Sequence, residues 1–297
     1  MHFHYICRCR YNKPRVAHMQ KITLIFVLSS VLAWAAGCTS SNEFEEYDYQ
    51  AVSALGDTLY APELRADTES RYRSNLKAAR AKYLANPDDA DAVIWYGRRS
   101  AYLGNYRKAI DIFTEGVEKH PRDARIYRHR GHRYITIRQF DKAVRDLEKA
   151  TELIRGTEDK IEPDGIPNRQ KQPRSTLHTN VWYHLGMAYY LQGNFRESAT
   201  AFQNCLEISP NDDMEVASSY WLYMALRRAG YDLEGGEVLE PIKEEMNLLE
   251  NRNYHRLLLV FKGVFKAESL LDKTGADAPD ALQAATKGYG TNPGHRR

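Results

Sequence analysis

The sequence repeats itself with a period of about 34 residues, and this period constrains the fold more than any other feature. Tyr106, Ala109 and Phe113 follow one another at helical steps of three and four, so all three share one face of a helix. The pattern returns one period later, and once more after a period that is lengthened by an insertion. A fixed period of this length is typical of arrays of helical repeats, in which each unit packs against the next.

Each copy also carries small residues at fixed positions, where an ordinary amphipathic helix would carry leucine or isoleucine. The first helix of each predicted pair has one such position and the second helix has two: Gly97, Gly131 and Gly186, then Ala109, Ala143 and Ser198, then Gly116, Ala150 and Cys205. Small side chains let two helices approach closely, while the neighbouring aromatic rings fill the space beside the crossing. Each copy is therefore predicted to be a tightly crossed helix pair.

These residues resemble the tetratricopeptide repeat (TPR), a family of helix–turn–helix units. Three copies match, two in residues 91–154 and the third in residues 179–212. The resemblance implies an all-α fold in which the helix pairs stack into a right-handed superhelical solenoid. The terminal repeats of solenoids are often irregular, because one of their faces meets water.

The segments that flank these copies extend the predicted array. We expect a capping helix within residues 61–90 and degenerate helical repeats in residues 213–290. The last predicted helix, residues 279–287, has no partner helix after it, as at a truncated end, so we expect the array to fray there. Residues 291–297 are polar and rich in helix breakers and are predicted to be disordered.

An insert at residues 155–178 separates the second and third copies. Its prolines, glycines and many charges argue against another helix pair. Its acidic residues lack the alternating spacing and the distal glutamate of an EF-hand calcium loop; they are Glu158, Asp159, Glu162 and Asp164. We predict that the insert is a lid or edge loop without chemistry of its own.

The N-terminal region has the layout of a signal peptide whose true start is Met19. Lys21 precedes a mostly apolar run, positions 22–35, which is too short to span a bilayer comfortably, and Ala-Ala-Gly then precedes Cys38. This layout resembles a bacterial lipobox, which implies that residues 1–37 are removed and that Cys38 is lipidated. An ordinary secretory signal is the alternative. Residues 38–60 are predicted to be an acidic flexible tether, and the resemblance implies a lipid anchor in the cell envelope, at the outer membrane.

Removal of residues 1–37 changes the charge balance of the chain. This segment holds five of the 42 basic residues and none of the 39 acidic ones, so the chain from Cys38 onward has a net charge of −2. Such a balance gives no indication of nucleic-acid binding. Only Cys38 and Cys205 remain, so a lipidated Cys38 leaves no cysteine pair for an internal disulfide.

Motifs that carry catalysis are absent from the sequence. We find no phosphate-binding loop, dinucleotide fingerprint, zinc-protease motif or nucleophile elbow. We predict neither a metal site nor a cofactor, and Cys205 is expected to be a buried, inert thiol. The sequence therefore favours a protein–protein interaction scaffold over an enzyme. The alternative is an enzyme, or an enzyme subunit, with a site formed between residues 156–178 and the repeats.

The concave groove that the first helices of TPR arrays line is the predicted binding site. It is basic in its first half and aromatic in its second half, with Arg98, Tyr102, Arg125, Arg128, His132, Asn180, Tyr183 and Tyr190 as the predicted contact residues. Arginine pairs well with carboxylates, and tyrosine offers a rigid amphipathic contact. The predicted partner is therefore a protein or an extended acidic peptide. The alternative is that the arginines only keep the array soluble.

Some TPR domains clamp a C-terminal carboxylate with lysine and asparagine at set positions. The corresponding positions here are Ile94, Arg98, His129, Asn180 and His184. Only Arg98 among them is a strong cation, so the sequence does not predict a clamp of this kind.

Overall fold

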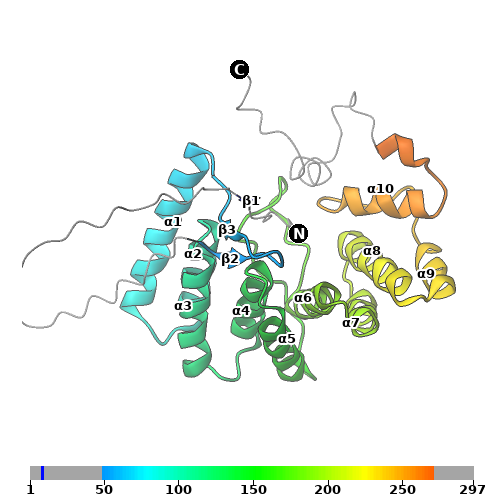
Figure 1. Cartoon of the computed structure of the whole chain (residues 1–297). Helices are drawn as coiled ribbons and strands as arrows, with labels where there is room; N and C mark the ends of the chain where they lie inside the picture. Colours follow the sequence, from blue (N-terminus) through cyan, green and yellow to red (C-terminus); the bar gives the residue numbers. More distant parts are fainter. Residues whose placement is uncertain (1–7, 10–48, 271–297) are drawn as a thin grey trace, which may run out of the picture.

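The helices follow one another as an extended array in which each helix packs against its neighbours in sequence (Figure 1). The structure is a computed structural model, and it describes residues 8–9 and 49–270. The helices are α1 (Ala66–Ala85), α2 (Ala90–Tyr102), α3 (Tyr106–Lys119), α4 (Ala124–Thr136), α5 (Phe140–Ile154), α6 (Leu177–Gln192), α7 (Phe195–Glu207), α8 (Asp212–Ala229), α9 (Asp232–Leu239) and α10 (Arg252–Phe261), followed by a 3-10 turn, η1 (Ala267–Leu270).

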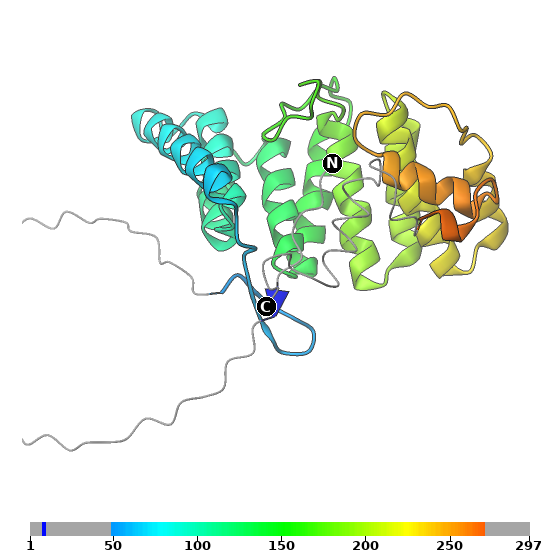
Figure 2. The same ribbon diagram turned by 90° about the horizontal axis from the view of Figure 1, so that it is seen from above.

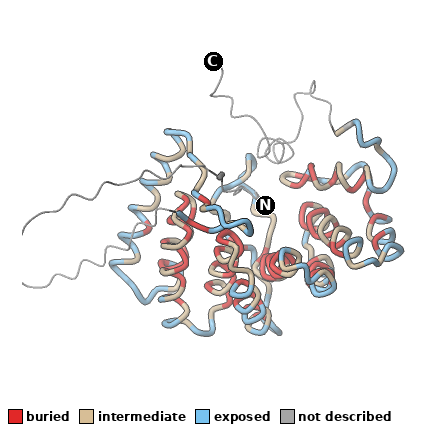
Figure 3. The backbone as a smooth tube through the Cα atoms, in the orientation of Figure 1, coloured by how far each residue is buried: buried red, intermediate tan, exposed pale blue. Residues whose placement is uncertain are grey.

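The tight helix crossings that the small residues predict are present. A Cβ atom added to Gly131 in α4 would lie 2.7 Å from Cγ of Leu147 in α5, and one added to Gly186 in α6 would lie 2.8 Å from the ring of Phe202 in α7. Backbone and side chain therefore touch where each first helix crosses its second helix. Figure 3 shows the buried residues concentrated where neighbouring helices face one another. The predicted all-α repeat fold is confirmed.

Local capping sets where the helices begin and end. The side chain of Asp123 accepts a hydrogen bond from the backbone N–H of Arg125 at the start of α4, and Asn211 does the same for Met214 at the start of α8. Gly193 and Gly230 end α6 and α8 with φ of 84°, a left-handed conformation that glycine adopts without strain.

A short sheet packs against the first repeat. Strands β2 (Ala51–Val52) and β3 (Thr58–Tyr60) form an antiparallel hairpin, and β1 (Arg8–Cys9) pairs with the other edge of β3. Oε1 of Gln50 accepts hydrogen bonds from the backbone N–H groups of Tyr106 and Arg107, so it caps the N-terminus of α3. The sequence predicts a flexible tether through residue 60, and this is wrong for residues 50–60, because the hairpin buries Leu59 and caps a helix.

The C-terminal part continues the array with a less regular geometry. Helices α8 and α9 form a fourth pair, and α10 packs on α8. The sequence predicts degenerate helical repeats over residues 213–290, and the described part of this region ends with α10 followed by the 3-10 turn η1. Within the described residues, no helix combines the length and the hydropathy that crossing a membrane requires. Three predicted features lie outside the described residues. They are the lipidation site Cys38, the helix at residues 279–287 and the signal peptide, of which only residues 8–9 are described.

Candidate partner-binding site

The insert runs along one edge of the array, beside α4 and α6, and the loop before α10 approaches it from the other side (Figure 2). Arg98 Nη2 donates a hydrogen bond to the carbonyl oxygen of Pro163 at 2.9 Å, and Arg99 Nη1 donates to that of Gly165 at 3.0 Å. Gly165 rests directly on the ring of Tyr102, where no Cβ atom would fit. We call the surface of α2, α4 and α6 that the insert contacts the first-helix face.

One carboxylate from the insert lies among polar groups of three successive first helices. Glu162 is 9% exposed, and its Oε1 lies 3.3 Å from Nη1 of Arg128, 3.4 Å from Nε2 of His129 and 4.0 Å from Nη1 of Arg98. Its Oε2 accepts a hydrogen bond of 2.9 Å from Nδ2 of Asn180. We call these five residues the Glu162 cluster. In this cluster, two guanidinium groups, an imidazole and an amide surround the carboxylate of Glu162.

The hydrogen-bond geometry defines the protonation state of His129. Arg128 Nη1 lies 2.7 Å from Nδ1 of His129, and a guanidinium can only donate, so Nδ1 accepts and Nε2 carries the hydrogen that faces Glu162. Burial, and then the Arg128 charge, hold the pKa of His129 well below its usual range. Burial also lowers the pKa of Arg128 to about 10, which leaves this side chain charged at neutral pH. The cluster therefore sets two positive charges against one negative charge.

Two further histidines extend the cluster along α4 and α6. The rings of His132 and His184 have centroids 4.2 Å apart, and Nδ1 of His184 lies 2.6 Å from the carbonyl oxygen of Asn180. Burial, followed by the nearby arginine charges, holds the pKa of both histidines well below the usual range. Both are therefore neutral at pH 7, which limits the positive charge beneath the insert.

Two atoms of the cluster have no hydrogen-bond partner among the described residues. They are Nε of Arg128, a donor, and Oδ1 of Asn180, an acceptor, and both residues are buried. A buried polar group without a partner carries a desolvation penalty. The Glu162 carboxylate therefore does not use the full hydrogen-bonding capacity of this site.

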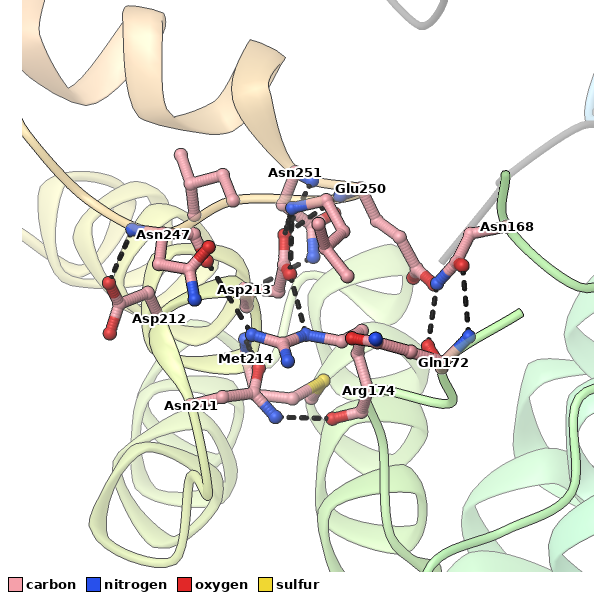
Figure 4. Close-up of polar contacts among 12 residues, drawn as sticks. Asn168, Gln172, Arg174, Asn211, Asp212, Asp213, Met214, Asn247, Glu250 and Asn251 are labelled. Carbon is pink, nitrogen blue, oxygen red and sulfur yellow. Dashed lines mark hydrogen bonds and ion pairs between the residues drawn. The ribbon is translucent and has the colours of Figure 1, made fainter. Parts of the chain in front are cut away.

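The far end of the insert is held by a second polar network, centred on Asp213 in the first turn of α8 (Figure 4). Its buried carboxylate accepts hydrogen bonds from Nε of Arg174 at 2.8 Å and from three successive backbone N–H groups, residues 249–251. Burial raises the pKa of Asp213, but these backbone donors and Arg174 outweigh it, so the pKa is lowered. Asn168 Nδ2 adds a hydrogen bond of 2.7 Å to Oε1 of Glu250. The insert is thus tied to α8 and to the loop before α10.

The predicted contact residues of the first half of the groove do not share one environment in the structure. Arg98, Arg128 and Asn180 belong to the Glu162 cluster, so they contact a carboxylate of the chain itself and lie beneath the insert. The ring of His132 contacts that of His184 beside them at a tilted angle. Arg125 stands apart, because its guanidinium pairs with Asp91 and Asp123. Arg98 and Arg128 are therefore covered by the chain itself, whereas the side chain of Arg125 stays partly exposed.

The predicted aromatic contact residues are also engaged within the fold. Tyr183 is fully buried against Phe202, and the ring of Tyr190 contacts that of Trp221 with centroids 5.2 Å apart. Tyr102 lies under Gly165 of the insert. These rings build the core and the floor beneath the insert.

Glu162 is the residue that the sequence reasoning missed. The sequence predicts a lid or edge loop without chemistry of its own, and the structure adds that Glu162 of this loop supplies the counter-charge for Arg98 and Arg128. Of the five positions compared with a C-terminal carboxylate clamp, Arg98, His129 and Asn180 contact this internal carboxylate, and the expectation that no such clamp is present stays a prediction. The available signal was an excess of cations on the first helices next to an acidic insert.

We also considered a reactive thiol and a metal site among the described residues. Cys205 is buried at a helix crossing, where burial raises its thiol pKa to about 12. Within the described ranges, no group of three or more histidine, cysteine, aspartate or glutamate residues is arranged to hold a metal ion.

Comparison with curated proteins finds two animal relatives. The chain is 23% identical over 168 residues to the BBSome complex member BBS4 of Bos taurus, which covers 57% of this chain and 28% of that protein. It is 28% identical over 188 residues to the tetratricopeptide repeat-containing protein trd-1 of Caenorhabditis elegans, which covers 59% of this chain and 21% of that protein. The chain thus spans about a quarter of the length of these relatives.

Solved structures of MamA are among the similar folds. One crystal structure of MamA has a TM-score of 0.45 at 14% identity and covers 69% of this chain and 100% of that chain. MamA 41-end from Desulfovibrio magneticus RS-1 has a TM-score of 0.42 at 16% identity and covers 60% of this chain and 94% of that chain.

The family model of the tetratricopeptide repeat matches residues 179–212, which are the third predicted copy and include α7 and most of α6. Helix pairs α2–α3 and α4–α5 repeat its close crossing, with Gly97 and Gly131 packed on Phe113 and Leu147. Repeats of this type form scaffolds for protein–protein interaction. The chain thus contains a tetratricopeptide repeat at residues 179–212, within an array of similar helix pairs.

Proposed function

We propose that the protein is a membrane-anchored interaction scaffold of the bacterial cell envelope, which binds a partner protein or peptide on its first-helix face. The observation that carries this proposal is the convergence of Arg98, Arg128 and Asn180, from α2, α4 and α6, on a single carboxylate. Groups from three successive repeats that meet at one acidic side chain form a recognition site for acidic protein segments.

The test of the binding site uses substitutions that keep side-chain volume and remove charge. The double variant Arg98→Met and Arg128→Met is compared with Arg125→Met, which removes a guanidinium outside the Glu162 cluster. After crosslinking in native membranes, we expect the double variant to lose the partner and Arg125→Met to retain it. Recovery from wild type should fall with salt, because a charged contact is screened over about 8 Å at physiological ionic strength. Equal recovery from both variants, each with intact helical circular dichroism, would show that the partner binds elsewhere.

The membrane anchor is proposed from the lipobox pattern at Cys38. We expect Cys38→Ala to stop lipidation, so that the protein is released from the outer membrane or stays unprocessed. Cell fractionation and the mass of the N-terminal peptide measure this result. A Cys38→Ala protein that is cleaved and sediments with membranes like wild type would contradict the anchor.

A further inference from the structure

We propose that residues 161–166 of the insert are a built-in mimic of the partner, which is an extended acidic segment that displaces them from the first-helix face. The inference rests on the proposed function and adds the chemistry of the partner and the means by which the site is kept closed. In the sequence Ile-Glu-Pro-Asp-Gly-Ile, the glutamate enters the Glu162 cluster and the two isoleucines flank the bound portion.

The contacts of this segment are those of a bound peptide. Glu162 provides its main side-chain contact, and Arg98 and Arg99 hold the carbonyl oxygens of Pro163 and Gly165. Among the described residues, only two backbone hydrogen bonds join residues 160–162 to the rest of the chain, both to residues 175–177. The segment is therefore recognised by a charge and by backbone acceptors, which a separate chain can offer equally well.

The exposure of the flanking residues supports the same interpretation. Ile161 is 67% exposed and Ile166 is 42% exposed, although both are large apolar residues beside a buried glutamate. A segment selected to complete a core would bury its isoleucines and expose its acids. Here the carboxylate enters and the apolar side chains remain at the surface, so charge recognition holds the segment in place.

The fit of the insert leaves polar groups unsatisfied on both sides of the contact. Within the described part of the chain, Oδ2 of Asp164 is buried without a hydrogen-bond partner, as are Nε of Arg128 and Oδ1 of Asn180. Burial, and then the nearby Glu250, raise the pKa of Asp164, so this acid is poorly accommodated where it lies. A partner that places an acceptor at Arg128 Nε and a backbone N–H at Asn180 Oδ1 would satisfy groups that the insert leaves unpaired.

The insert has the advantage of being tethered. A flexible segment held beside its site has an effective concentration in the millimolar range, which a free partner must overcome. The anchors of the insert at Asn168 and Arg174 lie beyond the mimic, so they keep it close to the site whether it is bound or displaced. Removal of the Glu162 carboxylate should therefore raise the apparent affinity for an acidic partner by about tenfold or more.

The experiment uses the full chain and a synthetic peptide with the sequence DKIEPDGIP, which is residues 159–167. Its binding to wild type, to Glu162→Ala and to Glu158→Ala is measured by fluorescence anisotropy. Glu158 is an exposed acid of the same insert, so its variant is the matched control. We expect at least tenfold tighter binding to Glu162→Ala than to the other two proteins. A peptide with glutamine at its glutamate position, DKIQPDGIP, should not bind.

A second measurement distinguishes a partner mimic from a loop that merely rebinds. Crosslinking in membranes should recover more partner with Glu162→Ala than with wild type, and added DKIEPDGIP should remove it. Unchanged partner recovery by a folded Glu162→Ala protein would overturn the mimic. The double variant Arg98→Met and Arg128→Met separates the two proposals. If it loses the partner while Glu162→Ala does not change partner recovery, the partner binds at the first-helix face and only the mimic is wrong.

Discussion

The α2–α4 side of the first-helix face and the less regular α8–α10 surface belong to one helical array but stabilise their side chains differently. The α2–α4 side carries Arg98 and Arg128, whose counter-charge comes from an insert that follows both helices in the chain and is separated from them by α5. The α8–α10 surface carries stacked rings, with Tyr220 on Tyr254 at 4.5 Å and Tyr223 on Phe261 at 4.8 Å between centroids. The charged region therefore depends on a distant segment, whereas the aromatic region is complete in itself.

The difference follows from the nature of the two interactions. Apolar and aromatic burial is largely non-directional, so the nearest helix of the array is a sufficient partner. A buried guanidinium requires an oppositely charged group with suitable geometry, because removing an ion from water costs several kcal/mol. Charged positions in a repeat array are thus the places where a loop or another protein is needed.

The largest expected effect comes from a buried ring of α7 that packs against the aromatic region. Phe202 is fully buried between Tyr183 and Trp221. We expect Phe202→Ala to lower the free energy of unfolding by about 3–5 kcal/mol, because it removes buried surface and leaves a cavity. Urea unfolding followed by circular dichroism measures this loss, and Phe261→Ala, at the exposed edge, should lose less. A smaller loss for Phe202→Ala than for Phe261→Ala would show that the core does not depend on this ring.

The network that joins the insert to α8 should give the next largest effect. Asp213→Asn keeps the shape of the side chain but removes the charge that three backbone donors and Arg174 share. We expect a loss of about 3 kcal/mol in unfolding free energy, with faster hydrogen exchange at residues 249–251. The matched control, Asp212→Asn, affects an exposed carboxylate with one backbone donor and should lose less than about 1 kcal/mol. Equal losses for the two variants would contradict a special role for Asp213.

Acidification should weaken the charged region first. The pKa values of His129, His132 and His184 are lowered in the folded protein, so below pH 6.5 the unfolded chain takes up protons that the folded chain does not. Stability present above that pH is therefore lost as pH falls, by about 1.4 kcal/mol per pH unit for each histidine. The lowered pKa of Asp213 adds a loss only at more acidic pH. Equal urea midpoints at pH 7.0 and 5.5 would rule out three neutral buried histidines.

The smallest effect is expected at Arg125, a charged residue outside the Glu162 cluster. Its side chain is 42% exposed and pairs with Asp91 and Asp123. Exposed ion pairs contribute about 0.2–1 kcal/mol, so Arg125→Met should change stability within that range. A double-mutant cycle with Asp91→Asn measures the coupling, which should shrink in high salt. Coupling above about 2 kcal/mol would place Arg125 among the structurally required charges.

The helix pairs and their crossings can be predicted from the residue pattern alone. Glycine in each first helix and alanine or serine in each second helix recur from copy to copy, and each helix crossing is a contact between near neighbours in the chain. Such local packing can be predicted from spacing, because residue size and helical period are sufficient to define it. The same reasoning placed Arg98, Arg128 and Asn180 on one surface, where the structure has them.

Which segment pairs with these charges is seen only in the folded chain. Glu162 reaches back to Arg98 past the three intervening helices α3, α4 and α5, and Gln50 reaches forward to cap α3, in both cases through irregular segments that have no period. The path of an irregular segment depends on all of its turns together and on the contacts at its ends, such as the ion pair of Arg174 with Asp213. No regular residue spacing predicts such a path. Periodic packing therefore follows from the sequence, whereas the pairing of charges between an insert and a repeat array is settled only when the whole chain has folded.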